Sequence, residues 1–243
     1  MVGKKVRNSG DVYRLIPDIH KGITSLHLLG PRNVFIKSHL KYFDEMPLRE
    51  DTLGVVYIVR NPLDVIASAI NYLPLRDSDA YPEAGEEQRQ EARQSLLNEF
   101  LEKGGPDRWT SLGMGTWPEH VTSWHRKDLP FPRITLKYED LRTQPAECVA
   151  QLCSFLSIER SADQIEAALA ASSFESMRAM EEKEVAEGQP GLFAAENPAS
   201  TFSLGLRFMS KGTTGSYREA LTAAQIEKAK ERFGPVMRQL GYE

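Results

Sequence analysis

The stretch Gly54–Ser68, GVVYIVRNPLDVIAS, decides the fold class. Its first six residues are almost all apolar, which is typical of a strand that is covered on both faces. Asn61 then supplies a helix N-cap, Pro62 fills the first helical position and Asp64 places an acid in the first turn. A buried strand that leads directly into a helix is a βα unit, so the sequence predicts an α/β fold.

Two other runs are expected to be strands, Asn33–Lys37 (NVFIK) and Arg133–Lys137 (RITLK). Helices are predicted over Glu83–Lys103, Pro118–Arg126, Pro145–Leu156, Ser161–Met180 with a break near Ser172, and Thr222–Leu240. Alternating strands and helices give a mostly parallel sheet flanked by helices, which binds ligands at the carboxyl ends of its strands. We therefore expect one domain over residues 1–243, in which 187–205, rich in Gly, Pro, Asn, Ala and Ser, forms a mobile flap.

The composition excludes several classes of protein. Of the 243 residues 41% are hydrophobic and 26% charged, and the net charge of -4 leaves no broad basic footprint for nucleic acid. No apolar run approaches the ~20 residues of a membrane span, and the N-terminus lacks the apolar core of a leader. The two cysteines, Cys148 and Cys153, are predicted to be reduced core thiols, and no metal is expected because no ligand cluster occurs. The prediction is a cytoplasmic protein.

Lys37 and His39 form the first candidate pair for chemistry, in the segment FIKSHL. Period-2 alternation at a strand end would aim both side chains to the same side. A histidine can take a proton from a hydroxyl near neutral pH, and an ammonium can neutralise charge on a leaving phosphate oxygen. On spacing alone, a structural histidine and a solvated lysine fit the pattern better.

Arg60 and Ser68 form a candidate phosphate subsite. Arg60 follows the strand next to a helix N-terminus and Ser68 lies about two turns into that helix, so a guanidinium, free amides and a hydroxyl come together. An arginine that merely pairs with Asp64 or another surface acid fits equally well. Lys211 and Gly212 add a cation next to a flexible backbone, a pattern that also occurs in ordinary turns.

Tyr138, Phe174 and Met177 are candidates for contact with a purine, because aromatic faces stack on bases and thioethers fill their edges. Simple core packing explains Met177 better and the other two equally well. The run WPEHVTSW at Trp117–Trp124 has the spacing of one helical face, for which core packing is the expected role.

These segments, in this order, resemble the cytosolic-type sulfotransferases, which use 3'-phosphoadenosine-5'-phosphosulfate (PAPS). FIKSHL is similar to the family's K-T-H-L, YIVRNPLDVIAS to its Y-x-x-R-N-P-x-D-V-x-x-S, and LKYEDL to its Y-E-D-L strand end. WPEHVTSW, SSFESM and FMSKGTTGSY continue the likeness, which covers about 210 residues and looks closest to bacterial members.

The resemblance implies a fold like that of the P-loop NTPases, with a mostly parallel sheet between helices, and transfer of a sulfuryl group to a small hydroxyl acceptor. It implies His39 as general base and Lys37 as the cation of the transition state. Arg60, Ser68, Lys211 and Gly212 would then bind the 3'-phosphate of PAPS, and the adenine would lie among Tyr138, Ser172, Phe174 and Met177. A homodimer is also compatible with the likeness.

The sequence departs from the family in two places. The loop Y-P-K-S-G-T-T-W, which holds the 5'-phosphosulfate, has no counterpart here, so the likeness implies a start about one βα unit into the fold. Ser210 stands where the family usually has Arg, and Arg207 and Arg218 are candidate substitutes. The second hypothesis is therefore a truncated member that binds the nucleotide or a protein partner without turnover. A P-loop kinase is disfavoured, because the G-x-x-x-x-G-K-[ST] motif and a pair of acids for Mg²⁺ are lacking.

Overall fold

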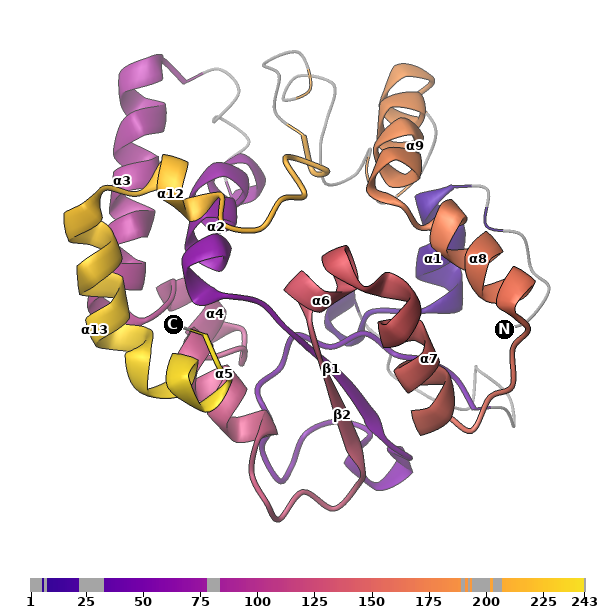
Figure 1. Cartoon of the computed structure of the whole chain (residues 1–243). Coiled ribbons are helices and arrows are strands. Elements are labelled where there is room, and N and C mark those ends of the chain that lie inside the picture. Colours follow the sequence, from indigo (N-terminus) through magenta and orange to yellow (C-terminus); the bar gives the residue numbers. More distant parts are fainter. Residues whose placement is uncertain are drawn as a thin grey trace. The chain divides into compact units, whose positions relative to one another are not determined.

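The computed structural model of the chain describes residues 6, 8–21, 33–77, 84–188, 191, 193, 202 and 207–242. These residues fall into two compact units (Figure 1). Unit 1 comprises residues 1–39, 75–83 and 173–210, and unit 2 comprises residues 40–74, 84–172 and 211–243. The chain passes between the units at five points, and three of them, after His39, Ser172 and Ser210, adjoin predicted site residues.

Unit 2 is built on two parallel strands, β1 (Val55–Val59) and β2 (Arg133–Lys137), paired in the register Val55 with Arg133 through Val59 with Lys137. Both strands were expected. Because they are parallel and in register, their carboxyl ends lie at one edge and present the next residues, Arg60 and Tyr138, side by side. The predicted βα unit is confirmed, since β1 leads into a helix at Pro62.

The helices of unit 2 lie on both sides of this strand pair. In Figure 1, α3, α5 and α13 gather on one side, and α7 lies on the other. The helices are α2 (Pro62–Asp77), which runs on into unit 1, α3 (Glu86–Lys103), α4 (Asp107–Ser111), α5 (Trp117–Trp124), α6 (Tyr138–Thr143), α7 (Pro145–Phe155), α8 (Ala162–Ala171), α12 (Tyr217–Ala220) and α13 (Ala223–Gln239). A short 3-10 helix, η3, spans Arg49–Asp51. The expected α/β architecture is confirmed.

Local sequence explains where several helices begin and end. The Thr222 hydroxyl accepts the backbone N–H of Gln225, and the Gln225 side chain accepts the backbone N–H of Thr222. This is the capping box of α13 that the sequence predicts. Gly104 ends α3 at φ +92°, a left-handed conformation that glycine adopts without steric cost. The break predicted near Ser172 is present, because α8 ends at Ala171 and α9 (Phe174–Ala186) begins with Ser173 as its N-cap.

The core of unit 2 lies between β1 and the helices α2, α3, α5 and α13. Leu63 and Ile66 of α2, Phe100 of α3 and Phe233 of α13 have no exposed surface. The Trp117 ring packs edge-on against Phe233, with 5.8 Å between ring centroids. As expected, Trp117, Val121 and Trp124 form the buried face of α5. Burial of these large side chains supplies the main driving force for this unit, at about 25 cal/mol per Å² of apolar surface.

Unit 1 contains α1 (Ser9–Leu15), the 3-10 helix η1 (Ile19–Lys21) and α9. Glu184 of α9, 1% exposed, accepts bonds from the backbone N–H and the hydroxyl of Ser9, at 2.5 and 2.6 Å. Glu181, one turn earlier and 0% exposed, accepts the backbone N–H groups of Phe208 and Met209. Two buried carboxylates of α9 therefore fasten distant segments of unit 1.

One expectation needs correction. Asn33–Lys37 is not a strand, because only Lys37 forms an isolated parallel bridge, to Asp18. Tyr138 directly follows β2, as expected, and is also the first residue of α6, a short helix with the acids Glu139 and Asp140 in its first turn. Most of the predicted flap, residues 187–205, lies outside the described residues.

Candidate functional site

The predicted site residues lie in both units, and each group is described in its own unit. Lys37, His39, Phe174 and Met177 belong to unit 1, and Arg60, Ser68, Tyr138, Ser172, Lys211 and Gly212 belong to unit 2. In the described part of the chain, no cluster of three His, Cys, Asp or Glu side chains has the geometry of a metal site.

Lys37 and His39 both point toward one carboxylate, that of Asp18. Lys37 Nζ lies 3.1 Å from Asp18 Oδ2, and His39 Nε2 lies 4.0 Å from the same oxygen. The expectation that the two side chains share a side therefore holds, although the segment is not a strand. Asp18 itself was not predicted, since nothing in the sequence places Pro17-Asp18 opposite Lys37.

The backbone fixes this arrangement. Lys37 N–H donates to Pro17 O and Ile19 N–H donates to Lys37 O, each at 2.9 Å. The backbone N–H of His39 donates to Nε2 of His20 at 3.2 Å, and the rings of the two histidines lie 5.8 Å apart. Residues 17–20 and 37–39 thus form one short, doubly anchored structure.

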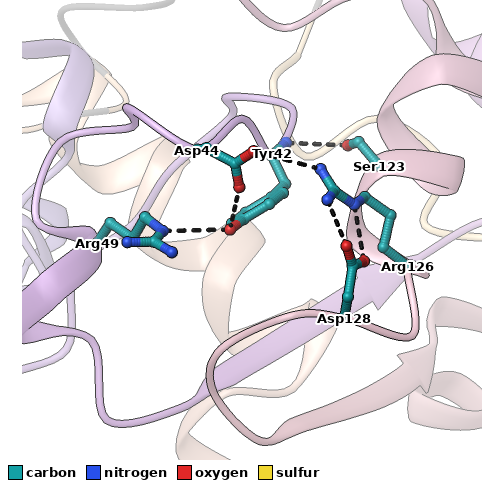
Figure 2. Close-up of polar contacts among 6 residues, drawn as sticks. All are labelled: Tyr42, Asp44, Arg49, Ser123, Arg126 and Asp128. Atoms are coloured by element: carbon teal, nitrogen blue, oxygen red, sulfur yellow. Dashed lines mark hydrogen bonds and ion pairs between the residues drawn. The ribbon is translucent and has the colours of Figure 1, made fainter.

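After His39 the chain enters unit 2, where hydrogen bonds hold residues 40–42. Trp124 Nε1 donates to Leu40 O at 2.9 Å, and Lys41 N–H donates to Gly113 O at 3.1 Å. Tyr42, 4% exposed, donates its backbone N–H to Ser123 Oγ at 2.9 Å (Figure 2). The backbone that immediately follows His39 is therefore pinned to α5 and the loop before it.

The side chain of Tyr42 is at the centre of the polar cluster in Figure 2. Its hydroxyl donates to Asp44 at 3.0 Å and accepts from Arg49 Nε at 3.3 Å. Arg126 pairs with Asp128 through two bonds of 2.9 and 2.6 Å, and its guanidinium carbon lies 5.4 Å from the centre of the Tyr42 ring. These contacts lock the ring in place, so they position the segment that follows the candidate base.

In unit 2, Arg60 and Tyr138 meet at the carboxyl ends of β1 and β2. The Arg60 guanidinium carbon lies 4.5 Å from the centre of the Tyr138 ring, and Arg60 Nη2 donates to Thr213 O at 3.1 Å. Arg60 Nε is buried and has no hydrogen-bond partner among the described residues. The alternative in which Arg60 pairs with Asp64 is wrong, because Asp64 binds other groups.

Asp64, 1% exposed, holds the loop that follows Lys211 and Gly212. Its Oδ2 accepts the N–H of Gly215 at 2.7 Å, and its Oδ1 accepts the Ser216 hydroxyl and the Tyr217 N–H, each at 3.1 Å. A buried carboxylate with three donors is fully satisfied. Asp64 thus binds the start of α2 to the loop at Gly215–Tyr217, a role that the sequence did not predict.

Lys211 and Gly212 come shortly before the residues that Asp64 binds. The Lys211 ammonium pairs with Glu219 at 2.5 Å, and its hydrogen bond and charge hold the pKa of that carboxyl below its usual range. Both side chains are mostly exposed, so the pair is weak and can open at little cost. Gly212 has φ +61°, a conformation that favours glycine.

The remaining predicted residues lie on or next to helices. Ser68 is exposed on α2, and Ser172 is exposed with its hydroxyl donating to Ala168 O at 2.8 Å. Phe174 and Met177, both half-buried, occupy the first turn of α9 in unit 1. His120, expected in the core face of α5, is half-buried and shares a 2.8 Å hydrogen bond with the hydroxyl of Tyr57.

Comparison with known families decides the identity of the fold. The sulfotransferase domain family matches residues 10–241, nearly the whole chain. The chain belongs to the sulfotransferase family. Among its curated relatives, this sulfotransferase-family chain is 25% identical over 230 residues to mouse sulfotransferase 1 family member D1, covering 90% of this chain and 66% of the relative. It is 26% identical over 187 residues to mouse sulfotransferase 2A6, covering 74% and 54% of the two chains.

Solved structures show the same fold. Mouse sulfotransferase SULT7A1, complexed with PAP, matches with a TM-score of 0.62 and 23% identity, over 88% of this chain and 69% of that one. Retinol dehydratase, in complex with androsterone and inactive cofactor PAP, matches with a TM-score of 0.58 and 20% identity, over 87% and 56%. The sulfotransferase-family chain thus spans 54–66% of the length of these two mouse relatives and has the α/β fold of the solved proteins. No described helix is long and apolar enough to cross a membrane.

Proposed function

We propose that this protein transfers a sulfuryl group from PAPS to a hydroxyl of a small-molecule acceptor. The observation that carries the proposal is the meeting of Arg60 and Tyr138 at the carboxyl ends of two parallel strands, where Arg60 keeps a buried Nε without a partner. Buried polar groups are normally hydrogen-bonded, so an unsatisfied guanidinium N–H beside a helix N-terminus suits an anion. Membership of the family, and the PAP bound to two solved neighbours, support the same nucleotide.

In this proposal the nucleotide contacts follow the family resemblance. Arg60, Ser68, Lys211 and Gly212 would bind the 3'-phosphate, and Tyr138, Ser172, Phe174 and Met177 would surround the adenine. Lys211 becomes available when its exposed pair with Glu219 opens. When bound, PAPS supplies the sulfuryl group and a phosphate leaving group.

The other half of the proposed chemistry belongs to Lys37 and His39. His39 would take the proton of the acceptor hydroxyl as the new oxygen–sulfur bond forms. Lys37 would neutralise the electron pair that returns to the phosphate oxygen as the old sulfur–oxygen bond breaks. Both side chains are about half exposed, at 48% for His39 and 49% for Lys37, so substrates can reach them. The acceptor is a small molecule in this proposal, and the protein acts in the cytoplasm.

Two measurements on the full chain test the proposal. Calorimetric titration with PAP is expected to show binding that Arg60→Ala weakens by about 10-fold or more, since a bond to a charged group contributes about 1.5–3 kcal/mol. Arg160→Ala removes a guanidinium that donates only to the neighbouring Glu159 carbonyl, and it serves as the matched control. Equal PAP affinity in wild type and Arg60→Ala would refute the proposed phosphate subsite.

The second measurement is sulfation of a phenol panel from PAPS. His39→Ala is expected to lower kcat by about 100-fold or more, the effect of losing a general base, without weakening PAP binding. Equal activity in wild type and His39→Ala would refute the role of His39. Binding of PAP without any turnover in the wild type would favour the alternative, a member that binds nucleotide or a partner without catalysis.

A further inference from the structure

Asp18 is a buried carboxylate next to two exposed, chemically capable side chains. Asp18 is 6% exposed, whereas the side chains of Lys37 and His39 are about half exposed. Burial of an ionised carboxylate is costly unless opposite charges and hydrogen-bond donors compensate for the lost water. The groups that contact Asp18 therefore show what compensates for the cost of burying its charge.

Those partners are the candidate catalytic residues and their neighbour. Oδ1 of Asp18 accepts the backbone N–H of His20 at 3.0 Å. Oδ2 faces both Lys37 Nζ at 3.1 Å and His39 Nε2 at 4.0 Å. The two backbone bonds between residues 17–19 and Lys37 keep Asp18 opposite Lys37, so this contact does not depend on side-chain rotamers alone.

The electrostatic environment favours the ionised form of Asp18. Burial alone would raise its pKa, but the N–H of His20, the hydrogen bond and charge of Lys37 and the charge of His39 together lower it below the usual value of 3.8. An anion within about 4–6 Å of an imidazole favours the imidazolium form. Asp18, Lys37 and His20 face His39, and Asp18 is the acid among these three groups.

His20 completes the cluster in a neutral role. Its Nε2 accepts the backbone N–H of His39, so that nitrogen carries no proton in this arrangement. His20 therefore binds the backbone of His39, while the carboxylate of Asp18 faces the His39 ring. With its Oδ2 4.0 Å from His39 Nε2, Asp18 is placed to stabilise a positive charge on His39.

We propose that Asp18 is a positioning residue for the sulfuryl transfer, which holds the Lys37 ammonium and stabilises the protonated form of His39. This inference rests on the proposed function. When His39 takes the proton of the acceptor hydroxyl, the oxygen–sulfur bond forms and the electron pair of the breaking bond goes to the phosphate oxygen. The positive charge that His39 gains then lies next to the Asp18 anion, and Lys37 stays directed at the leaving group.

The test is an NMR titration of the His39 ring in the full chain. Asp18→Asn keeps the shape and removes the charge, so the pKa of His39 is expected to fall by about 1 unit, the lower end of the effect of an adjacent opposite charge. Asp11→Asn removes an acid of α1 that pairs with Arg14, and it is expected to leave the titration of His39 unchanged. An unchanged pKa of His39 in a folded Asp18→Asn variant would overturn the proposal.

A second titration does not depend on whether Asp18→Asn folds. His39→Gln changes an exposed side chain, and linkage between the two groups requires that the pKa of Asp18 then rises, as read from its carboxyl carbon. An Asp18 pKa equal in wild type and His39→Gln would also overturn the proposal. In activity assays, Asp18→Asn should move the acidic limb of kcat/KM to lower pH while PAP affinity stays within about 2-fold of wild type.

The activity assay separates this inference from the proposed function. A wild-type protein that transfers no sulfuryl group overturns the proposed function and, with it, the role of Asp18 in positioning the catalytic residues. A wild type that is active, with a pH profile identical to that of Asp18→Asn, overturns only the role of Asp18.

Discussion

Asp64→Asn is the substitution for which the structure gives the sharpest expectation. The side chain is buried, keeps its shape in the variant, and retains one acceptor oxygen of two. When that oxygen keeps its bonds from Ser216 and Tyr217, the new NH₂ group faces the N–H of Gly215. Two hydrogen-bond donors then oppose each other, and the bond from Gly215 is lost. One charge-assisted bond is lost and two become neutral, which costs about 3–4 kcal/mol of the free energy of unfolding. A chain of this length would lose roughly 6–15 °C in Tm.

Urea unfolding of wild type and variant, followed by circular dichroism, measures this cost. The control is Asp163→Asn, the same change at an exposed position in the first turn of α8, where the expected loss is below about 1 kcal/mol. An Asp64→Asn variant that unfolds within about 1 kcal/mol of the wild type, with an equal m-value, would refute the reasoning that Asp64 fastens the loop at Gly215–Tyr217.

Three further outcomes follow from the described contacts. Thr222→Ala should lower stability by about 1 kcal/mol in urea unfolding, because the cap of α13 is lost, and Thr222→Ser should restore it. Gly104→Ala should cost about 1–2 kcal/mol in the same assay, because φ +92° strains any side chain, whereas Gly85→Ala at φ -66° should cost less. Asp18, whose folded-state pKa is lowered, stabilises the fold above its unfolded pKa of about 3.9, and this contribution disappears as pH falls through the folded value. The stability difference between wild type and Asp18→Asn should therefore shrink as pH falls below about 4 in stepped urea titrations, whereas a difference that is equal at about pH 5 and pH 3 would contradict it.

Local sequence signals predicted the elements whose cause is local. The apolar run before Asn61-Pro62 gave β1 and the start of α2, and Thr222 with Gln225 gave the start of α13. The first turn of α6 was missed although Glu139 and Asp140 are the acids expected there, because the short helix has no apolar period. For the helix starts, the deciding interactions lie within four residues along the chain.

What the sequence could not predict depends on partners far apart in the chain. Asn33–Lys37 alternates like a strand, but only Lys37 meets a partner, the stretch around Asp18. The bonds of Asp64 join residues more than 150 positions apart, and those of Glu184 to Ser9 join residues 175 positions apart. The spacing of residues along the sequence does not indicate such long-range pairings. The candidate site residues could be predicted from their side-chain chemistry, but the buried carboxylates that position the neighbouring backbone could not.

Two of the five points where the chain changes unit connect these carboxylates to the proposed reaction. His39 is the last residue of unit 1 before Leu40, and Lys211 is the first residue of unit 2 after Ser210. At the first point, the cluster around Asp18 holds residues 37–39, and Trp124 holds Leu40. At the second, Glu181 holds Phe208 and Met209, and Asp64 holds Gly215–Tyr217. His39 and Lys211 therefore each lie within a few residues of hydrogen-bonded backbone on both sides, although about half or more of each side chain is exposed. Within each unit these bonds fix the backbone next to an exposed functional side chain, an arrangement suited to binding a charged nucleotide.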